Sequence, residues 1–104
     1  TDRNIRVESL PRFPAITRDV SVLVDETLAA AQLRNTIVNA APSTLTEIRE
    51  FDRYQGTGIT KGKASLSVRL TFQSKERTLT DAEIQEAMEG ILAALVQKHN
   101  AVQR

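Results

Sequence analysis

The sequence predicts an α+β fold in which two helices cover one face of a four-stranded antiparallel sheet. Residues 63–73 alternate strictly between polar and apolar side chains, the pattern of a strand with one buried and one exposed face. Residues 84–95 instead repeat apolar side chains every three or four positions, as an amphipathic helix does. A length of 104 residues with 40% hydrophobic and 26% charged side chains suits one domain with one core.

The first half of the chain contains one strand and one helix. Residues 1–9 are polar and unpatterned, so we expect a linker from a preceding domain, with the folded domain at 10–104. Three alternating valines predict a strand over residues 17–25, because β-branched residues favour strands. Thr27 is the expected N-cap of the helix that follows. Its apolar stripe consists of Ala30, Leu33, Ile37 and Ala41.

The second half begins with a poorer strand over residues 45–55, where scattered charges are typical of an edge strand. Three glycines within residues 55–62 predict a hairpin loop before the alternating strand. Thr80 and Glu83 then have the spacing of a capping box at the start of the second helix. Residues 101–104 are expected to add a short last strand.

The order of these elements is strand, helix, strand, strand, helix, strand. Two right-handed crossovers in this order place both helices on the same face of the sheet. The arrangement is the ferredoxin-like βαββαβ split sandwich. Its other face stays open, so the polar side of residues 63–73 is available as a binding surface.

The open face is predicted to gather side chains that can hold an unpaired RNA base. Asp52 and Tyr54 lie two residues apart on one strand and therefore point the same way. The phenol ring can stack on a base, and the carboxylate can accept hydrogen bonds from a guanine edge. Ser65 would donate or accept beside the base, while Arg69 and Lys63 would meet phosphate. The candidate RNA-binding residues are Tyr54, Asp52, Ser65, Ser67, Arg69 and Lys63.

A structural interpretation of the same residues is also open. Tyr54 could cap the rim of the core, while Asp52 pairs with Arg69 or caps the loop. Arg18 is expected to form an ion pair at the start of its strand, pointing towards the helices. Glu50 shares the strand parity of Asp52, but no deep pocket or opposing acid accompanies the two carboxylates, so catalysis is not expected.

Composition and motifs exclude several other functions. A net charge of +1 argues against wrapping duplex DNA or coating a membrane. The absence of cysteine removes disulfides and thiolate metal sites and fits a reducing cytoplasm. Gly62 and Lys63 resemble the end of a Walker A loop, but Thr57 and Ala64 occupy two of its required positions. The only histidine, His99, is expected at a solvated helix end.

Four short sequence blocks occur in order along the chain. They are R-F-P-A at 12–15, closely followed by R-D, then F-D-R-Y-Q-G at 51–56, K-A-S-L at 63–66 and R-T-L-T-D-A-E at 77–83. Together they resemble the ferredoxin-fold anticodon-binding domain, which lies at the C-terminus of the β chain of bacterial phenylalanyl-tRNA synthetase. The resemblance extends from about Leu10 to Arg104. The main departure is Ala64, in a segment that is often more basic.

The resemblance implies a domain that reads the anticodon of phenylalanine tRNA, whose first base is guanine. In the family the aromatic ring of the F-D-x-Y-x-G block stacks on that base, its aspartate contacts the base, and the serine of K-x-S-L lies alongside. The matching residues here are Tyr54, Asp52 and Ser65. The parent enzyme is a cytoplasmic α2β2 ligase that joins phenylalanine to tRNA with ATP and Mg²⁺. Its chemistry belongs to the α chain, so this domain is expected to be non-catalytic and to hold no cofactor.

Three alternatives remain beside this interpretation. An ACT-type regulatory module, which binds a free amino acid, shares the order of strands and helices. A hydrolase of the acylphosphatase type would need an anion-binding loop after the first strand, where the acidic residues 25–26 repel phosphate. The single-chain mitochondrial phenylalanyl-tRNA synthetase ends in the same domain, although we favour the bacterial β chain.

Overall fold

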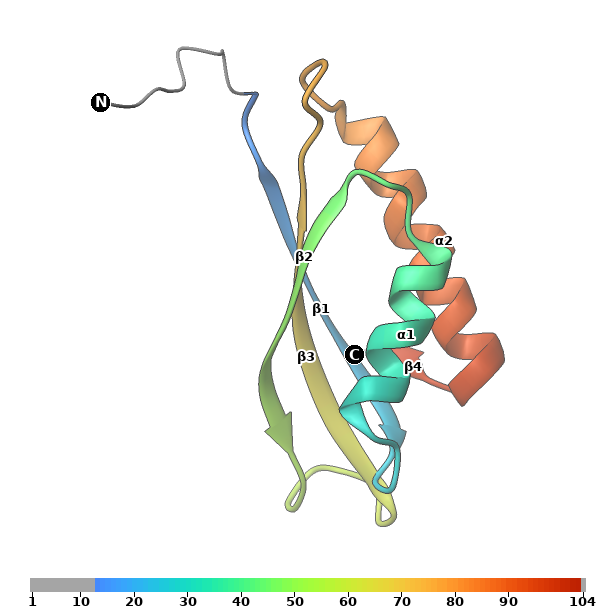
Figure 1. The fold of residues 1–104 in the computed structure, drawn as a ribbon. Helices are drawn as coiled ribbons and strands as arrows, with labels where there is room; N and C mark the ends of the chain where they lie inside the picture. The colour runs from blue at the N-terminus through green and yellow to red at the C-terminus, as the bar shows by residue number, and fades with distance from the viewer. Residues whose placement is uncertain (1–12, 104) are drawn as a thin grey trace, which may run out of the picture.

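The computed structural model describes residues 13–103 as a curved antiparallel sheet with both helices on one side (Figure 1). In chain order the elements are β1 (Ile16–Asp25), α1 (Ala30–Ala40), β2 (Leu45–Tyr54), β3 (Lys63–Phe72), α2 (Asp81–His99) and β4 (Val102–Gln103). The four strands are arranged in the order β2-β3-β1-β4. This topology confirms the predicted ferredoxin-like fold. The expected linker at 1–9 and the end of the last strand at Arg104 lie outside the described residues.

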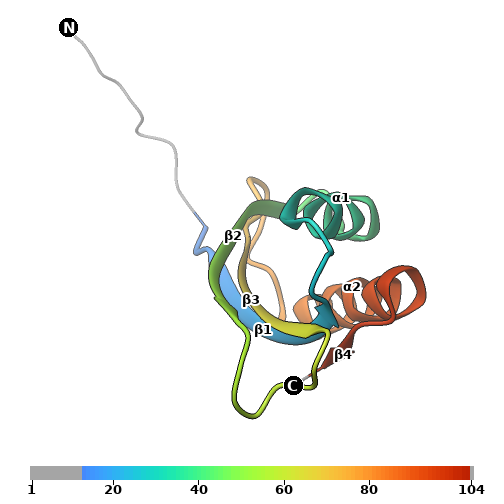
Figure 2. The same ribbon diagram turned by 90° about the horizontal axis from the view of Figure 1, so that it is seen from below.

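The core lies between the sheet and the two helices. Strands β1 and β3 pair along their whole length, from Ile16 opposite Phe72 to Asp25 opposite Lys63. This register places the valines of β1 beside the apolar row of β3, and both rows are buried under the helices. The helices contribute Leu33, Ile37, Ile84, Ile91 and Leu95 to the same cluster. In Figure 2 the sheet curves towards the side on which α1 and α2 lie.

The two helix starts differ in how well the sequence predicted them. Helix α2 begins as expected, because the Thr80 hydroxyl accepts a hydrogen bond of 3.2 Å from the Glu83 N–H. The Thr27 cap of α1 is wrong, since the N-cap is Ala29. The Thr27 N–H and hydroxyl instead donate to the Asp25 carboxylate at 2.9 and 2.7 Å. This turn at the end of β1 leaves Thr27 two residues before the N-cap.

His99, the last residue of α2, contacts the middle of α1 rather than facing only solvent. Its Nε2 lies 2.7 Å from the Thr36 hydroxyl oxygen on α1. That hydroxyl donates to the Gln32 carbonyl at 3.1 Å, so the ring nitrogen is placed to donate to Thr36. His99 therefore lies at a helix end, as expected, but it is half-buried and bonded to α1 rather than fully solvated. Asn100 then ends α2 in a left-handed conformation with φ of 54°.

Candidate nucleic-acid interface

The face of the sheet away from the helices carries the side chains that the strand register directs outward. On the central strands these are Thr17, Asp19, Ser21 and Leu23 of β1 and Lys63, Ser65, Ser67, Arg69 and Thr71 of β3. On β2, Arg49, Asp52 and Tyr54 lie opposite Arg69, Ser67 and Ser65. We call this surface the open face. All six predicted RNA-binding residues belong to it.

A β-bulge in β2 decides which of its side chains reach the open face. Its pairing with β3 slips by one residue between Glu50 and Asp52, so Glu50 lies opposite Val68 on the helix side. The expectation that Glu50 and Asp52 share a face was therefore wrong. Phe51 is the extra residue of the bulge, and its ring lies 5.2 Å from the Arg69 guanidinium carbon. Strict alternation along β2 would direct Phe51 towards the core, so the sequence pattern did not identify it as a surface residue.

Tyr54 ends β2 with an accessible ring that is held in place. The residue is 43% exposed, and its hydroxyl donates to the Thr57 carbonyl at 2.9 Å. Gly56 has φ of 128°, a conformation that favours glycine, and a side-chain carbon there would lie 3.6 Å from the Tyr54 hydroxyl. The ring is thus oriented by the loop and is not covered by a helix, which leaves it available for stacking.

Asp52 and the two serines lie beside Tyr54 but differ in access. Asp52 is exposed, and its side chain makes no hydrogen bond or ion pair within residues 13–103. Ser67 lies 2.7 Å from the hydroxyl of Ser21, and Ser65 lies between Tyr54 and Leu23 in the register. Both serines are buried, with an exposed fraction of 4% for Ser65 and 8% for Ser67. Asp52 therefore offers a free acceptor, whereas direct contact of the serines with RNA stays a prediction.

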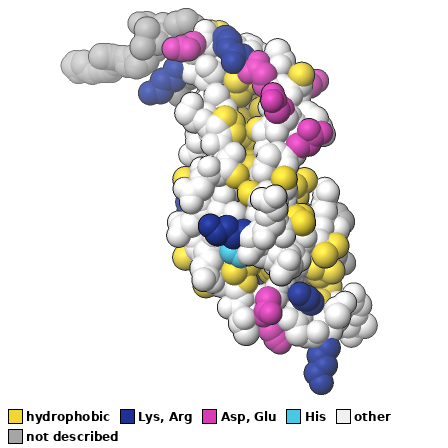
Figure 3. Space-filling model, turned by 90° about the vertical axis from the view of Figure 1, so that its right-hand side faces the viewer, with side chains coloured by type: hydrophobic (Ala, Val, Ile, Leu, Met, Phe, Trp, Pro, Cys, Tyr) yellow, Lys and Arg dark blue, Asp and Glu magenta, His cyan; other side chains and the backbone are white. Residues whose placement is uncertain are grey.

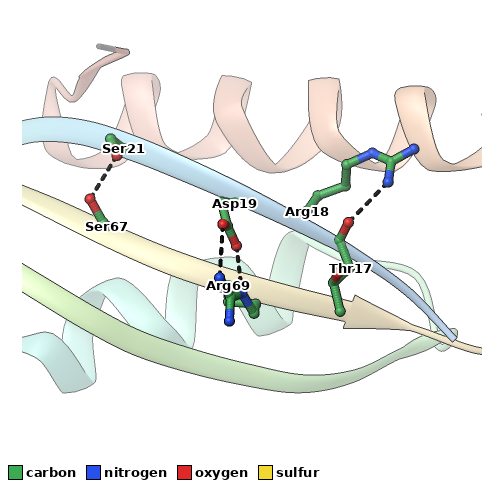
Figure 4. A network of polar contacts seen from close by, with 6 residues as sticks. All are labelled: Thr17, Arg18, Asp19, Ser21, Ser67 and Arg69. Atoms are coloured by element: carbon green, nitrogen blue, oxygen red, sulfur yellow. Dashed lines mark hydrogen bonds and ion pairs between the residues drawn. The ribbon is translucent and has the colours of Figure 1, made fainter.

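Arg69 forms an ion pair with Asp19, a partner that the sequence did not suggest. Its Nε and Nη2 donate to the two carboxylate oxygens of Asp19 at 2.8 and 3.1 Å, as Figure 4 shows. These hydrogen bonds from Arg69 hold the pKa of Asp19 below its ordinary value, and Asp19 raises the pKa of Arg69. The alternative pairing of Arg69 with Asp52 is therefore wrong. Asp19 also balances the charge of Arg69, so the predicted phosphate contact of Arg69 stays a prediction.

Two further cations lie at opposite ends of the central strands. Lys63, at the start of β3, is half-buried opposite Asp25, and the pKa of Asp25 is lowered by its bonds from Thr27 and by this nearby ammonium. Arg18 extends towards α2, as expected, with its guanidinium 3.9 Å from the Asp81 carboxylate (Figure 4). Lys63 thus remains a candidate phosphate contact at one end of the open face.

Part of the helix-covered side is acidic (Figure 3). Figure 3 shows that acidic side chains gather on this side, near the end of the molecule where α2 begins. Helix α2 carries Asp81, Glu83, Glu86 and Glu89 in its first half. Because carboxylates repel phosphate, the open face is the more favourable surface for RNA.

The described residues offer no site for a metal ion. Residues 13–103 contain no group of three or more histidine, cysteine, aspartate or glutamate side chains arranged to bind one. The glycine-rich loop is the β2–β3 hairpin and precedes a strand, so it lacks the helix N-terminus of a phosphate-binding loop. Within the same residues, neither helix is both long and apolar enough to cross a membrane.

Comparisons with known proteins agree with this geometry. Residues 11–104 match the model of the ferredoxin-fold anticodon binding domain. Phenylalanine–tRNA ligase beta subunits of Geobacillus kaustophilus and Halalkalibacterium halodurans are 39% and 42% identical over 100 residues, which cover 96% of this chain and 12% of each relative. That of Symbiobacterium thermophilum is 44% identical over 86 residues, or 83% of this chain and 10% of the relative.

The match is far shorter than the relatives themselves, since this chain spans only about a tenth of their length. It nevertheless includes β1 to β4, the bulge of β2 and every residue of the open face. The sequence blocks and the topology both agree with this match. The chain belongs to the ferredoxin-fold anticodon-binding domain family.

Proposed function

We propose that this domain binds the anticodon loop of phenylalanine tRNA and holds its first base, a guanine, on the open face. The observation that carries the proposal is the pairing of an exposed, oriented Tyr54 ring with the free carboxylate of Asp52. An aromatic platform and an adjacent hydrogen-bonding group are the usual means of recognising an unstacked RNA base. Family membership supports the same conclusion.

The chemistry of Asp52 accounts for a preference for guanine. The Watson–Crick edge of guanine presents two neighbouring donors, an N–H and an amino group, and an ionised carboxylate accepts from both. Adenine presents an acceptor nitrogen at the position of the ring N–H, which the carboxylate would repel. Tyr54 supplies affinity for either purine, because stacking does not distinguish them. Asp52 therefore supplies specificity and Tyr54 supplies affinity.

We further propose that the domain serves a phenylalanine–tRNA ligase, as the names of its relatives suggest. In that enzyme it would work in the β chain of an α2β2 assembly in the cytoplasm. ATP and Mg²⁺ would be used elsewhere in the assembly. The relatives compared above are bacterial beta subunits, which favours that parent over the mitochondrial enzyme. The domain would recognise tRNA without taking part in the chemistry.

The direct test compares two anticodon stem-loops that differ only in guanine or adenine at the first anticodon position. Fluorescence anisotropy should show tighter binding of the guanine form by the wild-type chain, and this preference should disappear in Asp52→Asn. An amide cannot accept both donors, so the loss should come from weaker guanine binding. Glu47→Gln, on the same strand, is the matched control and should keep the preference.

Equal binding of the two stem-loops by the wild-type chain would contradict the proposal. The ACT-type alternative makes the opposite forecast in a thermal melt. Free phenylalanine would then raise the melting temperature by binding the folded state, and the stem-loop would not.

A further inference from the structure

A second cluster on the open face has the composition of another base-binding site. The guanidinium of Arg69 lies between the Phe51 ring, 5.2 Å from its centroid, and the Asp19 carboxylate, to which it donates at 2.8 and 3.1 Å. All three side chains remain about half exposed, at 48% for Phe51 and for Arg69 and 49% for Asp19. Two contacts fix the plane of the guanidinium while leaving surface for a ligand. We call this cluster the Phe51 platform.

The Phe51 platform is separate from Tyr54. Tyr54 lies opposite Ser65 on β3, whereas the platform is built on Arg69, four residues farther along that strand. Phe51 itself lies between the rungs of Val68 and Ser67, two to three residues from the Ser65 rung, which is roughly 7–10 Å at about 3.3 Å per residue. Bases stacked directly on each other would be separated by only about 3.4 Å. A base on the Phe51 platform would therefore be a different base from the one on Tyr54, splayed out independently.

An unpaired cation lies beside this platform. Arg49 is opposite Arg69 in the register, and like charges at such positions repel each other. The bidentate bond to Asp19 balances Arg69, but Arg49 is exposed and its side chain makes no hydrogen bond or ion pair with the rest of the described chain. Its charge is left to attract an anion. A phosphate next to a base on the platform would supply one.

We propose that Phe51, Arg69 and Asp19 form a second platform for another unpaired base of the same RNA loop, with Arg49 contacting the adjoining phosphate. The inference rests on the proposed function and extends it from one recognised base to two. Aromatic rings and guanidinium planes both stack on RNA bases, and a single four-stranded sheet can hold two or three of them. Arg69 then stacks its planar guanidinium on the base and does not neutralise a phosphate.

The test combines protein variants with stem-loops that lack one base at a time. Dissociation constants are measured for wild type, Tyr54→Ala and Phe51→Ala against the intact anticodon stem-loop and against a series with one abasic site per loop position. Each variant should bind the intact loop at least about fivefold more weakly. The effect of Tyr54→Ala should vanish when the first anticodon base is missing. The effect of Phe51→Ala should vanish at a different position.

Two arginine variants separate stacking from charge. Arg69→Lys keeps the charge but loses the plane, so it should weaken binding as Phe51→Ala does, with an unchanged salt dependence. Arg49→Gln should instead lower the slope of log affinity against log salt by about 0.7.

Two further variants serve as controls. Phe51→Leu keeps an apolar side chain, so it tests whether Phe51→Ala binds weakly only because it misfolds, and it should bind as weakly as Phe51→Ala. Val96→Ala, at a position 50% exposed on α2, should bind like wild type.

The outcomes distinguish this inference from the proposed function. If Tyr54→Ala weakens binding but Phe51→Ala does not, or if both effects vanish at the same base, the second platform is wrong and the first stands. If Arg69→Lys binds like wild type, Arg69 is a phosphate contact and the platform is again wrong. If the wild-type chain shows no binding at millimolar RNA, both proposals fail.

Discussion

Replacing Tyr54 with alanine should separate RNA binding from folding. The ring is 43% exposed, and its one hydrogen bond, from the hydroxyl to the Thr57 carbonyl, is also exposed. Removal of that hydroxyl alone, in Tyr54→Phe, should cost at most about 1 kcal/mol of unfolding free energy. Loss of the whole side chain, in Tyr54→Ala, should cost about 1–2 kcal/mol of unfolding free energy, because the ring is only partly buried.

Tyr54→Ala should lower the affinity for RNA strongly while the domain stays folded. A stacked base is worth about 1–3 kcal/mol, so Tyr54→Ala should weaken binding of the anticodon stem-loop by roughly 5- to 150-fold. Tyr54→Phe keeps the ring and should retain most of the affinity. Urea unfolding and fluorescence anisotropy on the same samples measure both quantities.

Two results would refute this reasoning about Tyr54. An unfolding penalty above about 4 kcal/mol for Tyr54→Ala would mean that the ring belongs to the core, as core aromatics do. Unchanged affinity in a folded Tyr54→Ala chain would mean that the ring does not stack on the base.

Three further predictions concern stability, each measured by urea unfolding. Ile91→Ala should cost about 2–5 kcal/mol, because Ile91 is fully buried between the helices and the sheet; a cost below 1 kcal/mol would contradict the packing. Gly56→Ala should destabilise the fold by about 1–3 kcal/mol, since φ there is 128°. Gly90→Ala, in α2 with open space around an added carbon, should instead stabilise it by about 0.4–1 kcal/mol. A stabilising Gly56→Ala together with a destabilising Gly90→Ala would refute both backbone assignments. Arg69 lowers the pKa of Asp19, so the stabilisation from this pair is complete above the ordinary pKa of 3.8 and is lost as pH falls through the lower folded-state pKa. Asp19→Asn should therefore reduce the loss of stability that the wild-type chain shows below pH 3.8. An identical pH profile of the two chains would count against the pair.

Local sequence patterns were sufficient to predict the fold. The alternation of residues 63–73 fixed the faces of β3, and its partner valines in β1 followed the same rule. The cap formed by Thr80 and Glu83 also depends only on residues close together in the chain. Such features need no knowledge of tertiary contacts, so a single sequence reveals them.

The parts of the site that the sequence missed depend on pairing between distant segments. Phe51 reaches the open face only because of the bulge in β2, and no residue type marks that slip in register. Asp19 and Arg69 meet across 50 residues of sequence, and Thr36 meets His99 across 63. Asp52 and Tyr54 share the open face, as predicted, because both lie beyond the bulge, two residues apart on the same strand.

The central claim is that RNA binds the side of the sheet that no helix covers. An amide NMR titration of the chain with the anticodon stem-loop tests it most directly. Shifts concentrated on β2 and β3, with the largest changes at Asp52, Tyr54 and the loop after them, are the predicted result. Shifts concentrated on α1 and α2 instead would contradict the account.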